Sequence, residues 1–221
     1  MRVLPLSRTA LVLLLLSLAV PAGAAAQRRR APARKPAPVA PLKTAPGVLK
    51  CPELLGSGVK TGASFCFVLA GREPAAGVLV TIPAHAGTAT LLFDLHNRHT
   101  YSEEDVRAGR GFAKYTAVVA ALSMKGDLLG RGAVQTEFRT AADLYDRISG
   151  GAGPSGFKAV APLGREQISI PVPAGIDTVS LLGEVLDAAT AAGRETATPG
   201  RTVAIVSNVR VEFHPAAPAR R

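Results

Sequence analysis

Alternation of apolar and polar residues is the strongest signal in the chain, and it is clearest in residues 88–101, TATLLFDLHNRHTY. An extended backbone turns successive side chains to opposite faces of a sheet. One face then holds Leu91, Phe93 and Leu95, and the other holds Leu92, Asp94 and His96. We therefore predict a strand with one apolar face that ends in a polar, ionisable turn.

Short apolar runs recur along the rest of the chain, with glycine or proline between them. This rhythm is typical of strands. The runs cover residues 63–69, 77–82, 112–124, 128–138, 167–172, 176–186 and 202–213. Residues 112–124 also have apolar side chains at helical spacing, but the turn at 125–127 and the return strand after it favour a hairpin.

The last of these runs, residues 202–213, has the pattern of a half-buried strand. We expect one face to hold Val203, Ile205, Val209, Val211 and Phe213, and the other to hold Asn208, Arg210 and Glu212. Alternation that continues without a break predicts this division of the side chains.

One segment, residues 140–148, has the features of a short helix. Thr140 can cap it, Asp143 lies in its first turn, and Ser149-Gly150-Gly151 ends it. Many short strands with one short helix, and no alternation of strands with long helices, predict an all-β fold built as a single β-sandwich.

Two short stretches suggest a family. The closing strand, Ser207 to Phe213, and the turn Pro173-Ala174-Gly175 together resemble galactose-binding-like jelly-roll modules. The resemblance implies a jelly-roll β-sandwich that binds sugars or other polymers.

The first residues are typical of export. Arg2 and Arg8 precede an apolar run at 10–20, and small residues follow, with cleavage sites after Ala24 or Ala26. The run is short for a membrane anchor, which is the alternative. We expect a signal peptide at 1–26, no transmembrane helix in the mature form, and a secreted or periplasmic protein. No cysteine near the cleavage site offers a lipid acceptor.

Proline, alanine and arginine dominate residues 27–48, which we expect to form a disordered tether. The β-sandwich domain then spans 49–215, and a basic tail spans 216–221. The composition of the leader suits a GC-rich bacterial source.

The formal net charge of +10 lies outside the domain, because residues 51–219 contain 15 Lys and Arg against 16 Asp and Glu. A neutral domain excludes specific nucleic-acid binding. The basic tether can contact anionic surfaces.

The two cysteines, Cys51 and Cys66, are predicted to form a disulfide, because export exposes them to oxidising conditions. Their spacing matches neither a redox C-x-x-C pair nor a zinc site.

The polar turn after residue 93 contains the candidate site. Asp94, His96 and His99 are suitable ligands for a divalent metal, and we expect no other cofactor. Tyr101 and Glu103 extend the set to a ligand-binding site, with Tyr101 as an aromatic platform. A solvated polar turn is the alternative.

A second motif, residues 151–156, has the letters of a G-x-G-x-x-G loop. The predicted helix before it and the extended chain after it contradict a dinucleotide-binding role. We expect a surface loop.

Three functions follow from these observations. The first is an exported, non-catalytic β-sandwich that binds an envelope polysaccharide, a small ligand or a partner protein through the loops at 97–105 and 149–156. The second is a structural or assembly subunit of the envelope. The third is a metal-dependent enzyme that uses Asp94, His96 and His99.

Overall fold

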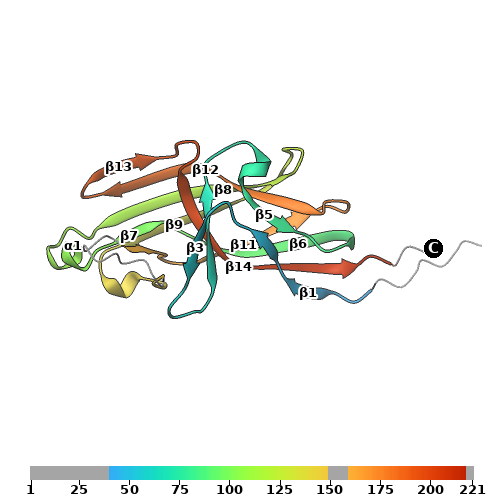
Figure 1. Cartoon of the computed structure of the whole chain (residues 1–221), viewed down its shortest axis with the longest axis horizontal. Helices are drawn as coiled ribbons and strands as arrows, with labels where there is room; N and C mark the ends of the chain where they lie inside the picture. Colours follow the sequence, from blue (N-terminus) through green and yellow to red (C-terminus); the bar gives the residue numbers. More distant parts are fainter. Residues whose placement is uncertain (1–39, 149–158, 218–221) are drawn as a thin grey trace, which may run out of the picture. The chain divides into compact units, whose positions relative to one another are not determined.

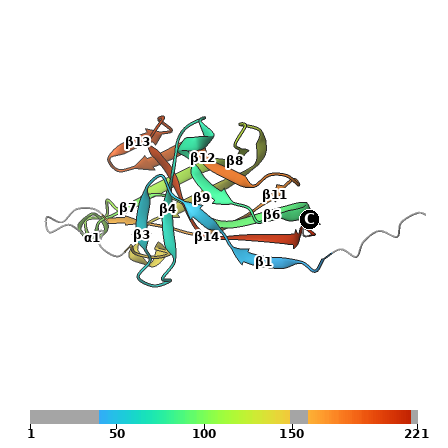
Figure 2. The same ribbon diagram turned by 45° about the vertical axis from the view of Figure 1, so that its right-hand side comes forward.

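In a computed structural model, the chain forms two facing antiparallel sheets, which confirms the predicted all-β sandwich (Figure 1, Figure 2). The structure describes residues 40–148 and 159–217. The predicted signal peptide, most of the tether, the glycine loop at 149–156 and the last four residues lie outside the described residues.

The first sheet has the strand order β11-β6-β14-β4-β3, and β1 also pairs with β14. Its strands are β1 Lys43–Pro46, β3 Leu54–Ser57, β4 Ser64–Leu69, β6 His85–His96, β11 Glu166–Val172 and β14 Thr202–Pro215. The strand β6 is the predicted strand around Phe93, and it lies between β11 and β14.

The second sheet has the order β2-β5-β12-β8-β9, and β13 pairs with the end of β12. Its strands are β2 Val48–Lys50, β5 Val78–Thr81, β8 Ala113–Ser123, β9 Leu128–Phe138, β12 Thr178–Thr190 and β13 Gly193–Thr196. The strands β8 and β9 pair as the predicted hairpin. A separate two-stranded ribbon joins β7 His99–Tyr101 to β10 Ala159–Ala161.

The main core lies between the two sheets, and β6 contributes to it as predicted. Leu91, Phe93 and Leu95 are buried in this core. At one edge β9 packs directly on β11. A Cβ added at Gly132 would lie 2.8 Å from Ile168 Cγ1. Glycine is therefore required in β9 for the two sheets to approach this closely.

The strand β14 contains a bulge that inverts its alternation. The cross-strand pairing with β6 shifts between Ser207 and Arg210, and Asn208 has φ 51°. As a result Val209 enters the main core, while Ile205 packs on the opposite face with Phe65. The prediction that Ile205 shares a face with Val209 is therefore wrong, because one inserted residue moves every later side chain to the other face.

The expected helix at 140–148 is a single 3-10 turn, Ala141–Asp143. The Asp143 carboxylate accepts hydrogen bonds from the backbone N–H groups of Arg139 and Thr140, which closes that turn. The chain then continues as irregular structure held by tertiary contacts. A second 3-10 turn spans Pro74–Ala76.

The α-helix of the described chain is α1, Glu103–Arg107. No helix in residues 40–148 and 159–217 is long and apolar enough to cross a membrane.

Folded structure begins before the predicted boundary at residue 49. The strand β1 pairs with β14 from Lys43 opposite Phe213 to Pro46 opposite Arg210, within the predicted tether. The side chains of β1 are mostly exposed, so its stability comes from backbone hydrogen bonds and its sequence lacks a hydrophobic pattern.

The predicted disulfide between Cys51 and Cys66 is present, and it connects the segment after β2 to β4. Both residues contact the main core, since Cys66 is buried and Cys51 packs against it. The bond thereby connects a strand-end of one sheet to an inner strand of the other.

Replacement of both cysteines by alanine is expected to lower the free energy of unfolding by about 3 kcal/mol, because the unfolded chain loses a loop constraint. Urea unfolding of the double variant and of the oxidised protein measures this difference. Reduction of the unaltered protein with a thiol serves as the control, since it removes the bond without changing the sequence. An unfolding midpoint that does not move in either case would contradict a stabilising role.

Candidate functional site

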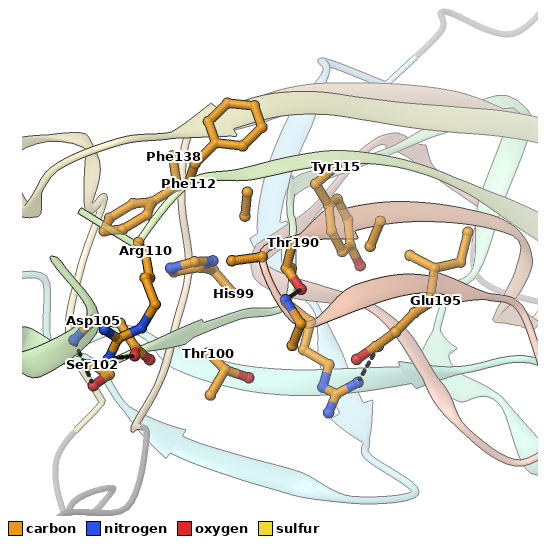
Figure 3. Close-up of a pocket in the computed structure, with 17 residues that line it drawn as sticks. His99, Thr100, Ser102, Asp105, Arg110, Phe112, Tyr115, Phe138, Thr190 and Glu195 are labelled. Carbon is orange, nitrogen blue, oxygen red and sulfur yellow. Dashed lines mark hydrogen bonds and ion pairs between the residues drawn. The ribbon is translucent and has the colours of Figure 1, made fainter. Parts of the chain in front are cut away.

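The candidate site is a cavity of about 480 Å³ at the end of the sandwich where β7, α1, β8, β12 and β13 meet, here called the His99 pocket. Figure 3 shows His99 near its centre, with Ser102, Asp105 and Arg110 on one side and Tyr115, Thr190 and Glu195 on the other. Cavities at the ends of sheets, lined by aromatic rings and a few polar groups, are common ligand sites.

His99 is positioned by the short strand β7, whose alternation turns His99 inward and Thr100 to solvent. The imidazole stacks on the Phe138 ring with 4.1 Å between ring centroids. Just before β7, the buried Asn97 donates to Thr136 Oγ1 and accepts from the Leu163 N–H. These contacts fix the turn that joins β6 to the pocket.

One wall of the His99 pocket comes from the start of α1. Ser102 Oγ accepts a hydrogen bond from the Asp105 N–H, which caps this short helix. The Asp105 carboxylate in turn pairs with Arg110 at 3.2 Å. This pair places a carboxylate and a guanidinium side by side in the wall of the pocket.

The opposite wall comes from the ends of β12 and β13. Arg98, from the turn before β7, pairs with Glu195 at 3.5 Å. The Tyr115 hydroxyl donates to the Val203 carbonyl oxygen. Burial raises the pKa of the Tyr115 phenol far above its ordinary value, so the hydroxyl stays protonated.

Phe112 lies at the pocket and is 40% exposed. The Arg139 guanidinium lies 5.1 Å from its centroid. This cation–π contact holds one face of the ring. An aromatic ring held in place beside a cavity is a surface on which another ring can stack.

The structure does not bring Asp94, His96 and His99 together. His96 is buried, with Nδ1 bonded to the Gly164 carbonyl oxygen and Nε2 to Ser207 Oγ, both at 2.8 Å. In the part of the chain that the structure describes, no three His, Cys, Asp or Glu side chains lie close enough to hold a metal ion. The predicted metal set is separated because Asp94 and His96 face outward from β6, whereas His99 belongs to the next strand.

Tyr101 and Glu103, the other predicted ligand residues, are not among the residues that line the pocket. Tyr101 is 8% exposed and packs edge-on against Phe138, so the prediction of an exposed aromatic platform at this position is wrong. Its ring stabilises the small core beneath β7. Glu103 is exposed in α1 and pairs with Arg147 at 3.6 Å.

Most of the residues that line the pocket were not predicted from the sequence. The pair Arg98–Glu195 joins residues almost a hundred positions apart, and only the fold brings them together. The position of Phe112 could have been noticed in the sequence, because it immediately precedes β8 and its ring is therefore at the end of a strand. His99 is the predicted residue that lines the pocket.

The sequence matches no protein-family model and no curated protein. Among solved structures, the chain is similar to the K1 cleaved adhesin domain of Lys-gingipain from Porphyromonas gingivalis W83, with TM-score 0.34, 9% identity, and coverage of 80% of this chain and 99% of that one. It is also similar to the catalytic domain of a GH87 alpha-1,3-glucanase in complex with tetrasaccharides, with TM-score 0.30 and 13% identity. That match covers 83% of this chain and spans 30% of the glucanase chain. At TM-scores this low, the similarities establish neither a shared fold nor a function.

The burial of His96 predicts that the free energy of unfolding depends on pH. Burial lowers the pKa of His96, and this outweighs the backbone hydrogen bond to Gly164, which raises it. The unfolded chain, with a histidine pKa of about 6.5, then binds more protons than the folded one as the pH falls below that value. Stability contributed by neutral His96 is complete above pH about 6.5 and is lost as the pH falls through the lowered pKa, at up to about 1.4 kcal/mol per pH unit.

The free energy of unfolding, measured between pH 8 and pH 5, is expected to fall for the unaltered protein and to change less for His96→Gln. Glutamine cannot titrate, although it lowers stability at pH 8 by breaking buried contacts. His85→Gln is the matched control, because the His85 ring nitrogens are bonded to the backbone oxygens of Pro83 and Pro173. An equal pH dependence in His96→Gln and the unaltered protein would refute the assignment.

Proposed function

We propose that this chain is an exported, non-catalytic β-sandwich protein that binds a sugar ring of an envelope polysaccharide in the His99 pocket. The observation that supports this most directly is the combination, at one cavity, of the exposed Phe112 ring with polar side chains fixed by partners. A sugar ring presents the same combination, since its C–H groups form an apolar face and its hydroxyls lie around the edge.

The polar groups of the pocket are suited to binding. Arg98 and Glu195 form one pair and Asp105 and Arg110 form another, so two carboxylates and two guanidiniums are held in place before a ligand arrives. Binding then costs little side-chain entropy, which increases affinity. Thr100, exposed on β7, adds a hydroxyl at the same cavity.

Export is supported by the sequence of residues 1–26 and by the disulfide. Structural disulfides persist mainly in oxidising compartments. The Cys51–Cys66 bond is structural, because it links two parts of the main core. An exported binding protein meets envelope polymers directly.

Expression of the full chain in a bacterial host is expected to place the protein outside the cytoplasm, because residues 1–26 have the organisation of a signal peptide. Intact-mass measurement of the exported protein is expected to show a chain that begins at Ala25 or Gln27. Insertion of two aspartates in the apolar run at 10–20 is the control and should keep the protein in the cytoplasm. An exported chain that still begins at Met1 would contradict cleavage.

Replacement of Phe112 by alanine is expected to weaken sugar binding about tenfold, because the loss of a stacked aromatic face costs roughly 1.5 kcal/mol. Calorimetric titration of the mature chain with neutral hexasaccharides of glucose, galactose and N-acetylglucosamine measures this effect. The matched control is Leu128→Ala, which removes a side chain of 45% exposure at the other end of the β8–β9 hairpin.

Two results would contradict the proposal. One is the absence of binding to every hexasaccharide in the series. The other is an equal loss of affinity in Phe112→Ala and Leu128→Ala, because the sugar would then not contact the pocket ring. Thermal unfolding of both variants verifies that they are folded.

A further inference from the structure

A second cavity, of about 450 Å³, lies on the face of the first sheet that is turned away from the main core, here called the Arg210 groove. It is lined by Pro46, Asp94, Arg165, Gln167, Asn208, Val209 and Arg210. Strand pairing assembles these residues, since Gln167 lies opposite Asp94 and Pro46 lies opposite Arg210. Most of the lining is therefore polar and comes from β6, β11 and β14.

The centre of the Arg210 groove is fixed by an unusual backbone position. Asn208 has φ 51°, and among the described residues it is the only residue other than glycine with positive φ. Its side-chain Nδ2 donates to Asp94 Oδ2 at 2.7 Å, and Asp94 is 3% exposed. Left-handed backbone costs about 1–2 kcal/mol and is found at ligand sites more often than elsewhere. The pair holds a buried carboxylate at the floor of the groove.

The charge of the Arg210 groove favours an anion. Arg165 lies 3.8 Å from the Asp94 carboxylate, and its side chain is 54% exposed. Arg210 is exposed, and no carboxylate of the described residues lies within ion-pair distance of it. The lining of the groove therefore contains two guanidiniums and one carboxylate. A guanidinium binds a carboxylate through two parallel hydrogen bonds, which fixes the orientation of the ligand.

We propose that the Arg210 groove binds an acidic saccharide, in which a sugar ring carries a carboxylate. Arg210 binds the carboxylate of the sugar, and Arg165 adds to the positive field. Asp94 and Gln167 hydrogen-bond to the hydroxyls, since a carboxylate accepts and an amide both donates and accepts. Pro46, which is exposed, contacts the apolar C–H face.

This inference rests on the saccharide-binding role proposed above, but it assigns a different surface and a different class of sugar. The two surfaces share no lining residue, so a variant of one leaves the other intact. The two proposals can therefore fail separately.

The test is calorimetric titration of the mature chain with trimers of galacturonate, glucuronate and mannuronate, each beside its methyl ester. The ester keeps the hydroxyls and removes the charge. We expect at least one acid to bind, its ester to bind about tenfold more weakly, and Arg210→Gln to weaken binding of the acid about tenfold. The matched control is Arg72→Gln, which removes an exposed arginine that is not a lining residue of the groove and is expected to leave affinity unchanged.

Several results would overturn the assignment. They are the absence of binding to every acid, equal affinity for an acid and its ester, and equal losses in Arg210→Gln and Arg72→Gln, which would indicate nonspecific charge attraction. A loss of acid binding in Phe112→Ala would also overturn it, because the ligand would then occupy the His99 pocket. Arg210 is exposed, so Arg210→Gln is expected to fold, and thermal unfolding verifies this.

Discussion

The bulge at Asn208, held by its hydrogen bond to Asp94, determines which side chains of β14 face the core and which face outward. Strand side chains alternate, so one inserted residue exchanges the two faces from that point on. Before the bulge, Ser207 faces outward and bonds to His96. After it, Val209 faces the main core and Arg210 faces outward. If Asn208 were a regular strand residue, the alternation would turn the Arg210 side chain inward. An unpaired guanidinium in the core is strongly unfavourable.

The outer face of the first sheet has two zones on either side of this bulge. Around Ile205 and Phe65 it is covered, because Tyr145 and Ile148 pack on it. The covering segment is fixed by the Asp146 carboxylate, which accepts hydrogen bonds from the Lys60 and Thr61 N–H groups and from Thr61 Oγ1.

The close approach of that carboxylate requires glycine at position 58, where an added Cβ would lie 2.1 Å from Asp146 Oδ2. On the other side of the bulge, the described residues include no segment that covers the outer face in this way, and the Arg210 groove lies there. On the outer face of the same sheet, His96 is therefore buried and Arg210 is exposed to solvent.

The alternation of apolar and polar residues and the turn residues were enough to predict individual strands and hairpins. The alternation of Leu91, Phe93 and Leu95 predicted β6 and its buried face, and the turn at 125–127 predicted the β8–β9 hairpin. The placement of Ile205 could not be predicted, because the positive φ of Asn208 is stabilised by Asp94, a residue more than a hundred positions away. Alternation alone has no information about such a partner.

The wrong predictions for residues 140–148 and for Tyr101 have related causes. The helix expected at 140–148 had a cap and a stop signal, but its side chains are used in contacts with β4 and β14 that a continuous helix would break. Tyr101 was expected at the surface because its neighbours are polar. In the structure it is buried by Phe138, which comes from the far end of β9. Whether a single side chain is buried depends on segments that are distant in the sequence. The residues around Tyr101 therefore could not predict that it is buried.

The polar residues after Phe93 looked like one site in the sequence, and the fold distributes them over three environments. Asp94 lies at the floor of the Arg210 groove, His96 is buried against the sheet, and His99 lines the pocket at the end of the sandwich. Strand geometry explains this separation. Residues two apart on β6 share a face but lie at different positions along the strand. Asp94 is opposite Ser207 beside the bulge, and His96 is opposite Ile205. The turn at Asn97 then carries the chain off the sheet. A short polar run at the end of a buried strand can therefore supply one side chain to each of two surfaces while a third, His96, stabilises the sheet between them.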